Sequence, residues 1–534
     1  MLYAKEHLYE ALLRWNYFPN QKKGLSELPP TFTSRQLTPD IADILTNEVS
    51  MRKGGYGIVE YKSTRFNNVP RLLGIVHPTA HTHLSKVLYE NWEEYYHIYT
   101  NNNSIVRPEA HADGRAFIMN YEDYEEKVSR SLKTTFGKKF RAHTDISNCF
   151  NSIYTHSVEW ALRGLEETKI NLSLKPKNRT KHWSEDLDIK ARSSKRNETQ
   201  GIPIGPGTSS VIVEIILAKI DNKLAEKYDF DRYVDDYTCL CDSHEQAQEF
   251  IRDLSLELNN FKLSLNLTKT SIVELPEPLQ PAWVSDLVKS RPNFFIDNNY
   301  GTRKITLSEA IHFLDYAVRK NKQTPDGSVI KFAISSIIKH IHEDDTITIA
   351  DYILNLSWHY PLLLPFLDEM DINEENLAHF DLKEKLIKII NNNAHYKRSD
   401  GIAWPLYYLR KYNLEIENHV SEKIIESRDC VSICMLIDHN ESLPLALHFA
   451  RQITELSEFQ KDEYWLLLYQ LFLKGEIENP YENDRTFSIL KEHSVNFMPP
   501  TTEQTFAETF TVYKMFNAEG ELTYLEHFNK QKEQ

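Results

Sequence analysis

The pattern of hydrophobic and polar positions changes near residue 290. Before that point, short apolar stretches with strand-like alternation, such as GYGIVEYKS and RLLGIVHP, are interleaved with stretches of helical spacing such as SKVLYENWEEYYHIY. From about Ile305 onward the spacing is almost purely helical, as in SEAIHFLDYAVRKN, VIKFAISSIIKHI and LKEKLIKIINNN, with short breaks that hold Pro, Gly, Asp or Asn. The pattern therefore predicts an α+β region followed by an all-α region.

Two segments of the helical region resemble each other. IAWPLYYLRKY and EYWLLLYQLFL place Trp, Leu and Tyr similarly, which indicates a degenerate HEAT-like helical repeat. We predict three parts: residues 1–100 with N-terminal helices and strands, residues 101–290 with mixed α and β elements, and residues 291–534 as an α-helical repeat domain.

Composition and charge restrict the function classes. With 534 residues, of which 41% are hydrophobic, the chain can bury sizeable cores and is unlike a disordered protein. Its net charge of -15 argues against a basic nucleic-acid coat and a polybasic membrane anchor. Residues 1–300 hold 38 basic and 40 acidic side chains and the remainder holds 24 and 37, so that the acidity is concentrated in the C-terminal part. A negative helical region is better suited to protein partners than to gripping DNA.

Neither cysteines nor apolar runs indicate export or membrane insertion. The five cysteines form no C-x-x-C pair and no disulfide ladder, and the two close pairs are expected in the core. The N-terminus shows no signal segment, and no run reaches the 18 apolar residues of a membrane span. We expect a cytoplasmic protein that does not contact a membrane.

Three aspartates carry the candidate chemistry. In DRYVDDYTCLC, Asp235 and Asp236 lie between two short β-type runs, which predicts a hairpin with both acids at its tip. In FRAHTDISNCF, Asp145 closes another short run and a helical stretch follows, so it can lie at the end of a neighbouring strand. Such acids could hold two divalent ions that activate a hydroxyl group and stabilise a leaving pyrophosphate.

Four segments in order resemble the motifs of reverse transcriptases. The run from Asp145 to Ile153 resembles palm motif A, QGIP at 200–203 resembles the start of motif B, YVDD at 233–236 matches the Y-x-D-D box, and LSLNLTKTSI resembles motif D. The resemblance implies an RNA-directed DNA polymerase, with the fingers within residues 1–100 and the palm within residues 101–290.

The resemblance also implies roles for individual residues. Asp145 and Asp235 would be the principal ligands of two Mg²⁺ ions, with Mn²⁺ as an alternative, and Asp236 would help to hold a metal ion or the primer end. Phe150 would be the aromatic steric gate that favours deoxynucleotides, the alternative being a plain core residue. Gln200 and Gly201 would line the nascent base pair, and Tyr233 of the Y-x-D-D box would bind the substrate. The loop QGIPIGPG precedes a helical run for which Thr208 or Ser209 is the predicted cap.

Basic side chains complete the predicted site. Lys269 fits a general acid that protonates the departing pyrophosphate, the alternative being a surface lysine. Lys62, Arg65 and Arg71 resemble the basic residues of the fingers that clamp the triphosphate, and Arg71 is favoured among them. His77, His81 and His83 lack the spacing of a zinc site, and we expect them at a helix start and on the surface.

The organisation of the chain looks like that of the bacterial abortive-infection and defence-associated reverse transcriptases (Abi, or "unknown group", type). No recognisable RNase H, protease or integrase segment follows the polymerase motifs. The resemblance implies an antiphage enzyme that makes DNA from dNTPs, primes on a protein hydroxyl, works without a template and forms homo-oligomers. Two alternatives stay open: a templated, retron-type enzyme that copies a partner RNA, and a catalytically idle scaffold module.

Overall fold

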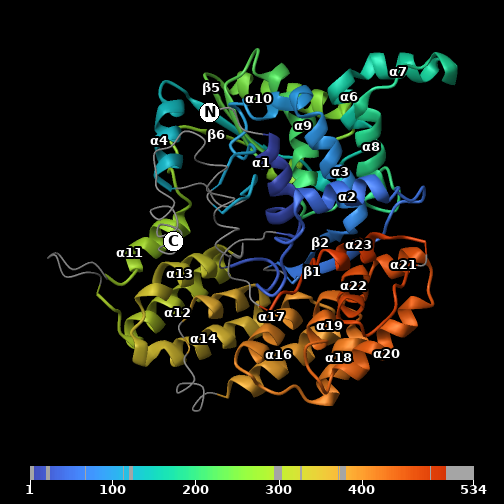
Figure 1. The fold of residues 1–534 in the computed structure, drawn as a ribbon. Coiled ribbons are helices and arrows are strands. Elements are labelled where there is room, and N and C mark those ends of the chain that lie inside the picture. The colour runs from blue at the N-terminus through green and yellow to red at the C-terminus, as the bar shows by residue number, and fades with distance from the viewer. Residues whose placement is uncertain are drawn as a thin grey trace, which may run out of the picture.

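The computed structural model describes residues 5–19, 25–65, 68–111, 113–118, 124–293, 303–324, 328–370, 372, 381–481 and 483–500. These residues form a four-stranded sheet, a separate β-hairpin and many helices (Figure 1). Among the described residues, all strands lie before residue 275, and the elements after that point are helices. The predicted α+β class is confirmed.

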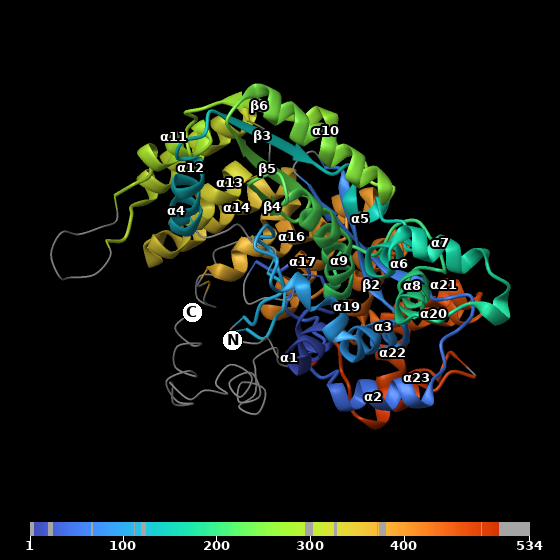
Figure 2. The ribbon, with the colours of Figure 1, turned by 90° about the horizontal axis from the view of Figure 1, so that it is seen from above.

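The antiparallel sheet carries the three acids of interest. Its strand order is β4-β5-β3-β6, and its strands are β3 (Phe140–Asp145), β4 (Phe230–Tyr233), β5 (Asp236–Cys241) and β6 (Ser271–Glu274). Helix α10 (His244–Asn260) packs against this sheet (Figure 2) and buries Ala247, Phe250, Leu254 and Leu258, an apolar stripe at helical spacing. Ser243 caps α10 by accepting a hydrogen bond from the Gln246 N–H at 3.2 Å.

The separate hairpin and its flanking helices come from the first hundred residues. They are α1 (Lys5–Glu10), α2 (Pro39–Glu48), β1 (Ile58–Thr64), β2 (Pro70–Val76) and α3 (Pro78–Glu90). The single helix predicted over 85–99 is wrong, because α3 ends at Glu90 and residues 92–98 form a 3-10 segment. The Asn91 side chain donates to the Val87 carbonyl at 2.9 Å, a local bond that competes with helix continuation.

The remaining helices fall into two groups along the chain. Between α3 and β4 along the chain lie α4 (Tyr124–Thr135), α5 (Cys149–Ser152), α6 (Ser157–Arg163), α7 (Leu165–Ser173), α8 (Trp183–Ser193) and α9 (Gly207–Leu224). The C-terminal region consists of α11 (Ala282–Ser290), α12 (Leu307–Gln323), α13 (Ser328–Ile337), α14 (Thr346–His359), α16 (Leu382–Tyr396), α17 (Asp400–Lys411), α18 (Asn418–Ser427), α19 (Cys430–Leu436), α20 (Leu443–Thr454), α21 (Glu458–Asp462), α22 (Trp465–Lys474) and α23 (Thr486–Glu492). None of the helices in the described ranges is both long enough and apolar enough to cross a membrane.

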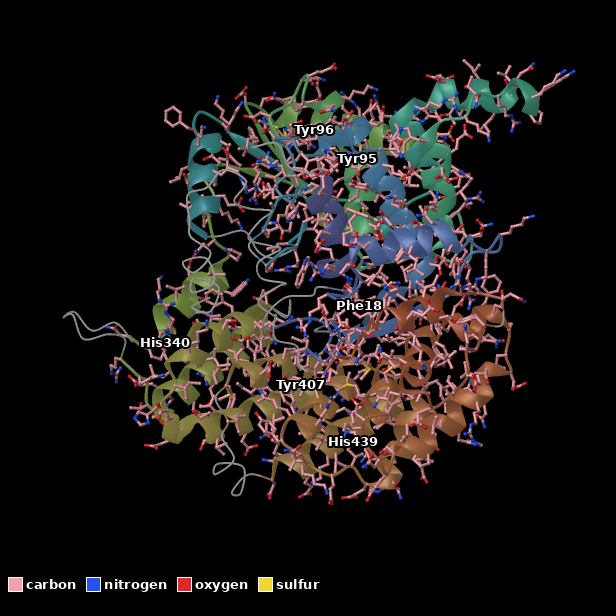
Figure 3. All side chains as sticks on the ribbon, in the orientation of Figure 1. Phe18, Tyr95, Tyr96, His340, Tyr407 and His439 are labelled. Carbon is pink, nitrogen blue, oxygen red and sulfur yellow. The ribbon has the colours of Figure 1, made fainter. Side chains whose placement is uncertain are left out.

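Buried apolar side chains form two cores. One core joins the four-stranded sheet to α9 and α10. The other joins the β1–β2 hairpin to the C-terminal helices, with Tyr61 of β1 and Trp465 of α22 among its fully buried members. Phe18 belongs to this second core and lies where the two halves of the molecule meet (Figure 3). The hairpin therefore packs with the C-terminal helices rather than with the sheet.

Three buried aspartates of the C-terminal region hold the N-terminal hairpin, and we call them the clasp: Asp400, Asp429 and Asp462. Asp462 accepts hydrogen bonds from Arg52 Nη2 at 2.7 Å and from the Gly57 N–H at 2.9 Å. Asp400 accepts from the Thr64 N–H at 2.8 Å. Asp429 accepts from Ser399 Oγ, which in turn accepts from the Lys62 N–H of β1 at 2.8 Å.

Candidate active site

Strand pairing brings the three predicted acids together. Asp145, the last residue of β3, is directly opposite Asp236, the first residue of β5. Directly opposed residues of antiparallel strands project their side chains from the same face of the sheet. The Ile146 N–H donates to the Asp235 carbonyl at 3.1 Å, so Asp235 also lies beside the end of β3.

A strained two-residue turn carries Asp235. Tyr233 of β4 pairs with Asp236 of β5, and Val234 and Asp235 connect them. Val234 has a φ of 57°, a left-handed conformation that a β-branched residue rarely adopts. Glycine would be the usual residue at this position of a tight hairpin. Strain of this kind persists only where the surroundings enforce it, and it is frequent at functional sites.

Burial and neighbouring negative charge raise the pKa of two of the acids, Asp235 and Asp236. Burial raises the pKa of Asp235 to about 6, and the charges of Asp145 and Asp236 add to this effect. Burial and Asp145 also raise the pKa of Asp236. Asp145 is 5% exposed, and its Oδ1 atom has no hydrogen-bond partner among the described residues. Crowded carboxylates without enough donors form a place where a cation is stabilised.

Lys269 neutralises part of this charge. Its ammonium forms an ion pair with Oδ2 of Asp145. The Asn266 N–H donates to the Asp145 carbonyl at 2.7 Å, which holds the turn of Lys269 beside β3. The hydrogen bond to Asp145 and the charges of all three acids raise the pKa of Lys269. Its side chain is 61% exposed, so the ammonium is also accessible to a bound substrate.

The residues fit a hard divalent cation by their chemistry. In the described ranges, no group of three or more His, Cys, Asp or Glu residues is already arranged to hold an ion. The ammonium of Lys269 occupies one oxygen of Asp145, while the other oxygen is open. Carboxylate oxygens are the ligands that Mg²⁺ prefers. Asp145, Asp235 and Asp236 are therefore the side chains that would hold Mg²⁺.

Phe150 lies next to the strained turn. It is 8% exposed on the short helix α5. Together with Val106, Phe117, Ser210, Val213, Glu214 and Val234 it lines a cavity of about 10 Å³. The structure therefore places an aromatic ring beside the residue that precedes Asp235.

Gln200 and Gly201 form a loop beside α5. The Gln200 amide donates to the Ser152 carbonyl at 3.1 Å, and the Gly201 N–H donates to the Ile153 carbonyl at 2.7 Å. Gly201 has a φ of 80°, and a Cβ atom there would lie 3.1 Å from the Asn151 carbonyl oxygen. Glycine is needed because this backbone is both left-handed and closely approached.

The predicted cap of the following helix is wrong. Helix α9 begins at Gly207 with Pro206 in the cap position, and Thr208 and Ser209 lie inside the first turn. The Gly207 N–H, one of the donors that a helix start leaves free, is satisfied by the Asn16 carbonyl at 2.6 Å. A distant segment thus replaces the local cap that the sequence predicts.

Of the three basic residues predicted for triphosphate binding, Arg71 is electrostatically linked to the acids. Burial lowers the pKa of Arg71, and the charges of Glu27 and Asp235 oppose that shift. Its Nε atom is buried without a hydrogen-bond partner among the described residues. Arg65 is exposed. Lys62 lies 3.9 Å from Glu60 and lines a different cavity.

That larger cavity does not contain the acids. It has a volume of about 320 Å³ and lies between β1, the end of α8 and the C-terminal helices, where Lys62, Arg196 and Arg428 are among its lining residues. The sheet and the catalytic candidates therefore lie outside this cavity.

The histidines lie elsewhere than expected. His77 directly precedes α3, as predicted, but His77 and His81 are fully buried rather than on the surface. His77 stacks on Tyr56 with ring centroids 4.6 Å apart, and His81 bonds to the Leu12 carbonyl at 2.9 Å. His83 is half-buried and bonds to the Val49 carbonyl at 2.7 Å. All five cysteines are free and buried, which confirms the core position predicted for the two close pairs.

Motif reasoning missed two residues that support the site. Arg232 is fully buried and donates to the Val234 carbonyl at 2.8 Å. Asn16 binds the backbone of residues 116–117, with its Oδ1 accepting from the Ala116 N–H at 2.7 Å and its Nδ2 donating to the Phe117 carbonyl at 3.1 Å. The one sequence signal for Arg232 is its position in the short strand-like run FDRYV, where a permanently charged side chain needs a buried partner.

Telomerases from two Candida species are among the solved structures that are similar to this chain. Apo telomerase from Candida tropicalis is 11% identical, with 80% of this chain and 74% of that chain covered and a TM-score of 0.31. The Candida tropicalis telomerase in complex with a TWJ fragment of telomeric RNA is 10% identical, with 78% and 68% covered and a TM-score of 0.31. The corresponding Candida albicans complex is 12% identical, with 69% and 55% covered and a TM-score of 0.22. These scores are too low to support an argument about this chain.

A family model gives the clearer relation. Residues 84–318 match the family described as "Reverse transcriptase (RNA-dependent DNA polymerase)". This stretch contains the sheet, Asp145, the turn of Asp235 and Lys269. The comparison with curated proteins gives no match. Residues 84–318 therefore form a reverse transcriptase domain, which makes this chain a nucleotidyltransferase of the RNA-directed DNA polymerase type.

Proposed function

We propose that this chain is an antiphage DNA polymerase that transfers deoxynucleotides from dNTPs onto a protein hydroxyl, with Mg²⁺ and without a template. The observation that carries the polymerase chemistry is the meeting of Asp145, Asp235 and Asp236 at the strand ends. The defence role, protein priming and untemplated synthesis rest on the resemblance of the motifs and of the helical C-terminal region to the abortive-infection type.

The reaction breaks a phosphoanhydride bond of the dNTP and forms a phosphate ester bond. A hydroxyl oxygen attacks the α-phosphorus, the bond to pyrophosphate breaks, and the hydroxyl proton passes to solvent. Two Mg²⁺ ions, held by the three aspartates, would supply activation of the hydroxyl and neutralisation of the pyrophosphate. Lys269 stays protonated at neutral pH because its pKa is raised, and it can donate a proton to the pyrophosphate.

Other side chains select and orient the nucleotide in this proposal. Phe150 beside Val234 would exclude a ribose 2′ hydroxyl and so favour a DNA product. Gln200 and Gly201 would line the nascent base pair, and Tyr233 would bind the substrate. The guanidinium of Arg71, which interacts electrostatically with Asp235, would bind the triphosphate through its planar set of N–H donors.

The finer organisation is also proposed rather than observed. We propose that residues 291–534 are HEAT-like repeats, that the chain works in the cytoplasm as a homo-oligomer, and that Mn²⁺ can replace Mg²⁺. The negative charge of this part favours protein partners over a long nucleic-acid duplex.

The test supplies purified protein with Mg²⁺ and labelled dNTPs, first alone and then with a primed RNA template. The expected result is a label that stays with the protein on a denaturing gel, is sensitive to nuclease and needs no template. The D235A/D236A variant should lose it. A matched control is D344A/D345A, a second adjacent acid pair in an exposed turn of the helical region, which should keep it.

The outcomes separate the candidate functions. Incorporation only with a template, together with a structured RNA that co-purifies, would replace the proposal by a templated, retron-type enzyme. No incorporation under any condition, with equal phage protection from D235A/D236A and wild type, would leave a scaffold module. Loss of protection in D235A/D236A alone supports the defence role.

The proposed gate has its own test. F150A should raise the incorporation of ribonucleotides relative to deoxynucleotides by about tenfold or more. Removing a clash with one of two substrates changes the difference between their activation free energies by a few kcal/mol. F117A removes a ring of the same size from the same cavity and should leave the ratio unchanged. Equal ratios in the two variants would assign Phe150 to the core alone.

A further inference from the structure

A buried ion cluster lies directly behind the turn that carries Asp235. Arg232 of β4 and Asp221 of α9 are fully buried, and Glu214 of α9 is 3% exposed. The Tyr237 hydroxyl donates to Asp221 Oδ1 at 2.9 Å, and Asn101 Nδ2 donates to Asp221 Oδ2 at 2.8 Å. The cluster therefore joins α9, β4, β5 and the loop of Asn101.

Arg232 uses all five of its guanidinium N–H donors. Nη1 donates to Glu214 Oε1 at 2.8 Å and Nη2 donates to Glu214 Oε2 at 2.9 Å, a bidentate pair. Nε donates to Asp221 Oδ2 at 2.9 Å, and Nη2 lies 2.7 Å from the same oxygen. The second N–H of Nη1 donates to the Val234 carbonyl at 2.8 Å. A lysine has three donors and no planar fork, so it cannot make this set.

The bond to Val234 acts on the strained residue of the turn. Val234 is left-handed with a φ of 57°, and the next residue is Asp235. A change of this peptide would move the Asp235 carboxylate, since a two-residue turn offers no other place to absorb the rotation. The Arg232 backbone is itself anchored, because its N–H donates to the Asn103 carbonyl at 2.6 Å.

We propose that Arg232 is a positioning residue for the reaction. Anchored by Glu214 and Asp221, it holds the Val234 carbonyl, keeps the turn left-handed and so fixes Asp235 relative to Asp145 and Asp236. This inference rests on the proposed function for its kinetic consequence, but not for its effect on cation binding.

The test compares R232K with wild type in two measurements. The first is Mn²⁺ binding to the free protein, followed by electron paramagnetic resonance, with D145A/D235A as the blank for the site. The second is the rate of nucleotide incorporation. R232K should weaken Mn²⁺ binding by about tenfold or more, and it should lower the incorporation rate by a similar factor. Losses of this size are found when groups that orient metal ligands are changed.

A second substitution separates positioning from stability. Glycine adopts a positive φ without strain, so the double variant R232K/V234G should recover at least about tenfold of the lost rate and binding, without recovering thermal stability. A purely structural Arg232 predicts no such rescue. E214Q weakens the pairing of Glu214 with Arg232 and keeps the arginine, so it should weaken Mn²⁺ binding by about threefold. This variant replaces R232K in the test if R232K does not fold.

A matched control keeps the inference falsifiable. R52K alters another arginine that binds a buried aspartate, since Arg52 Nη2 donates to both carboxylate oxygens of Asp462. It should lower the melting temperature and leave Mn²⁺ binding unchanged. Wild-type Mn²⁺ binding in both R232K and E214Q would overturn the inference, as would weakened binding that V234G does not restore. A wild-type protein that binds Mn²⁺ but incorporates no nucleotide would instead overturn the proposed function.

Discussion

The molecule buries aspartates in two places and treats them in opposite ways. For two clasp residues, Asp400 and Asp462, neighbouring hydrogen-bond donors oppose the effect of burial on the carboxylate. Burial raises the pKa of Asp400 to about 6, and the hydrogen bonds from Thr64 and Gly401 act against that shift. Burial also raises the pKa of Asp462, while Arg52, Gly57 and Tyr481 lower it. The clasp acids are surrounded by donors and hold the fold.

In the candidate active site, the neighbouring carboxylates add to the rise in pKa that burial causes. Asp145 and Asp236 raise the pKa of Asp235 further, and Asp145 keeps one oxygen without a partner in the described structure. Mutual repulsion costs stability in the cation-free protein. The difference teaches that burial alone does not distinguish a structural acid from a functional one. The neighbours do, because they are hydrogen-bond donors or cations around the clasp acids and other carboxylates around Asp235.

The largest predicted effect separates activity from stability. D145N should lower nucleotide incorporation by at least about a thousandfold, because several kcal/mol of charge stabilisation are lost. The melting temperature should stay the same or rise, since the variant removes a like charge from beside Asp235 and Asp236. Incorporation is measured with labelled dNTPs and melting by calorimetry. A variant that melts earlier and keeps its activity would show that Asp145 belongs with the clasp acids.

The second prediction is the mirror image. D462A leaves the guanidinium of Arg52, whose side chain is 17% exposed, without its buried partner. The free energy of unfolding should fall by about 3 to 5 kcal/mol, the usual result of breaking a buried ion pair from one side. Denaturant titration measures this change, and Mn²⁺ binding should be retained at low temperature. Retained stability would mean that Arg52 finds another acceptor, with Glu458 at 3.2 Å as the candidate.

The sequence predicts the active-site half well because its signals are local. The alternation in FRAHTD and DRYVDDYTCLC predicts β3 and the β4–β5 hairpin, and the acids fall at their ends. The helical spacing predicts α12, α16 and α17 for the same reason. Pairing of the strands then follows from the register that places apolar residues inward.

The sequence could not predict the clasp or the support of the turn. Arg52 and Asp462 are 410 positions apart, and Thr64 and Asp400 are 336 apart, so no local pattern links them. Val234 is β-branched, which favours a strand and not a left-handed turn. Its conformation depends on Arg232 and α9, which are tertiary contacts.

The third prediction uses the pH dependence of the clasp. The folded pKa of Asp400, about 6, lies above its usual value of 3.8, so the folded protein binds this proton more tightly than the unfolded chain. The stabilisation is complete below pH 4 and is lost as the pH rises through 6. Between those values the free energy of unfolding of the wild type should fall by about 1 to 3 kcal/mol more than that of D400N. Parallel curves for the two proteins would contradict the assignment.

The smallest predicted effect is a shift in the acid limb of activity. Asp235 has to be ionised to bind a cation, and its pKa of about 6 predicts that Mn²⁺ binding and incorporation fall as the pH drops through 6. D236N removes one of the charges that raise the pKa of Asp235. The midpoint of the pH curve should therefore move down by about half to one pH unit, even though the maximal activity falls. D344N, a change at an exposed aspartate of the helical region, should leave the midpoint in place. Mn²⁺ binding, followed against pH, gives the midpoint without requiring activity, and an unmoved midpoint in D236N would mean that burial alone sets the pKa of Asp235.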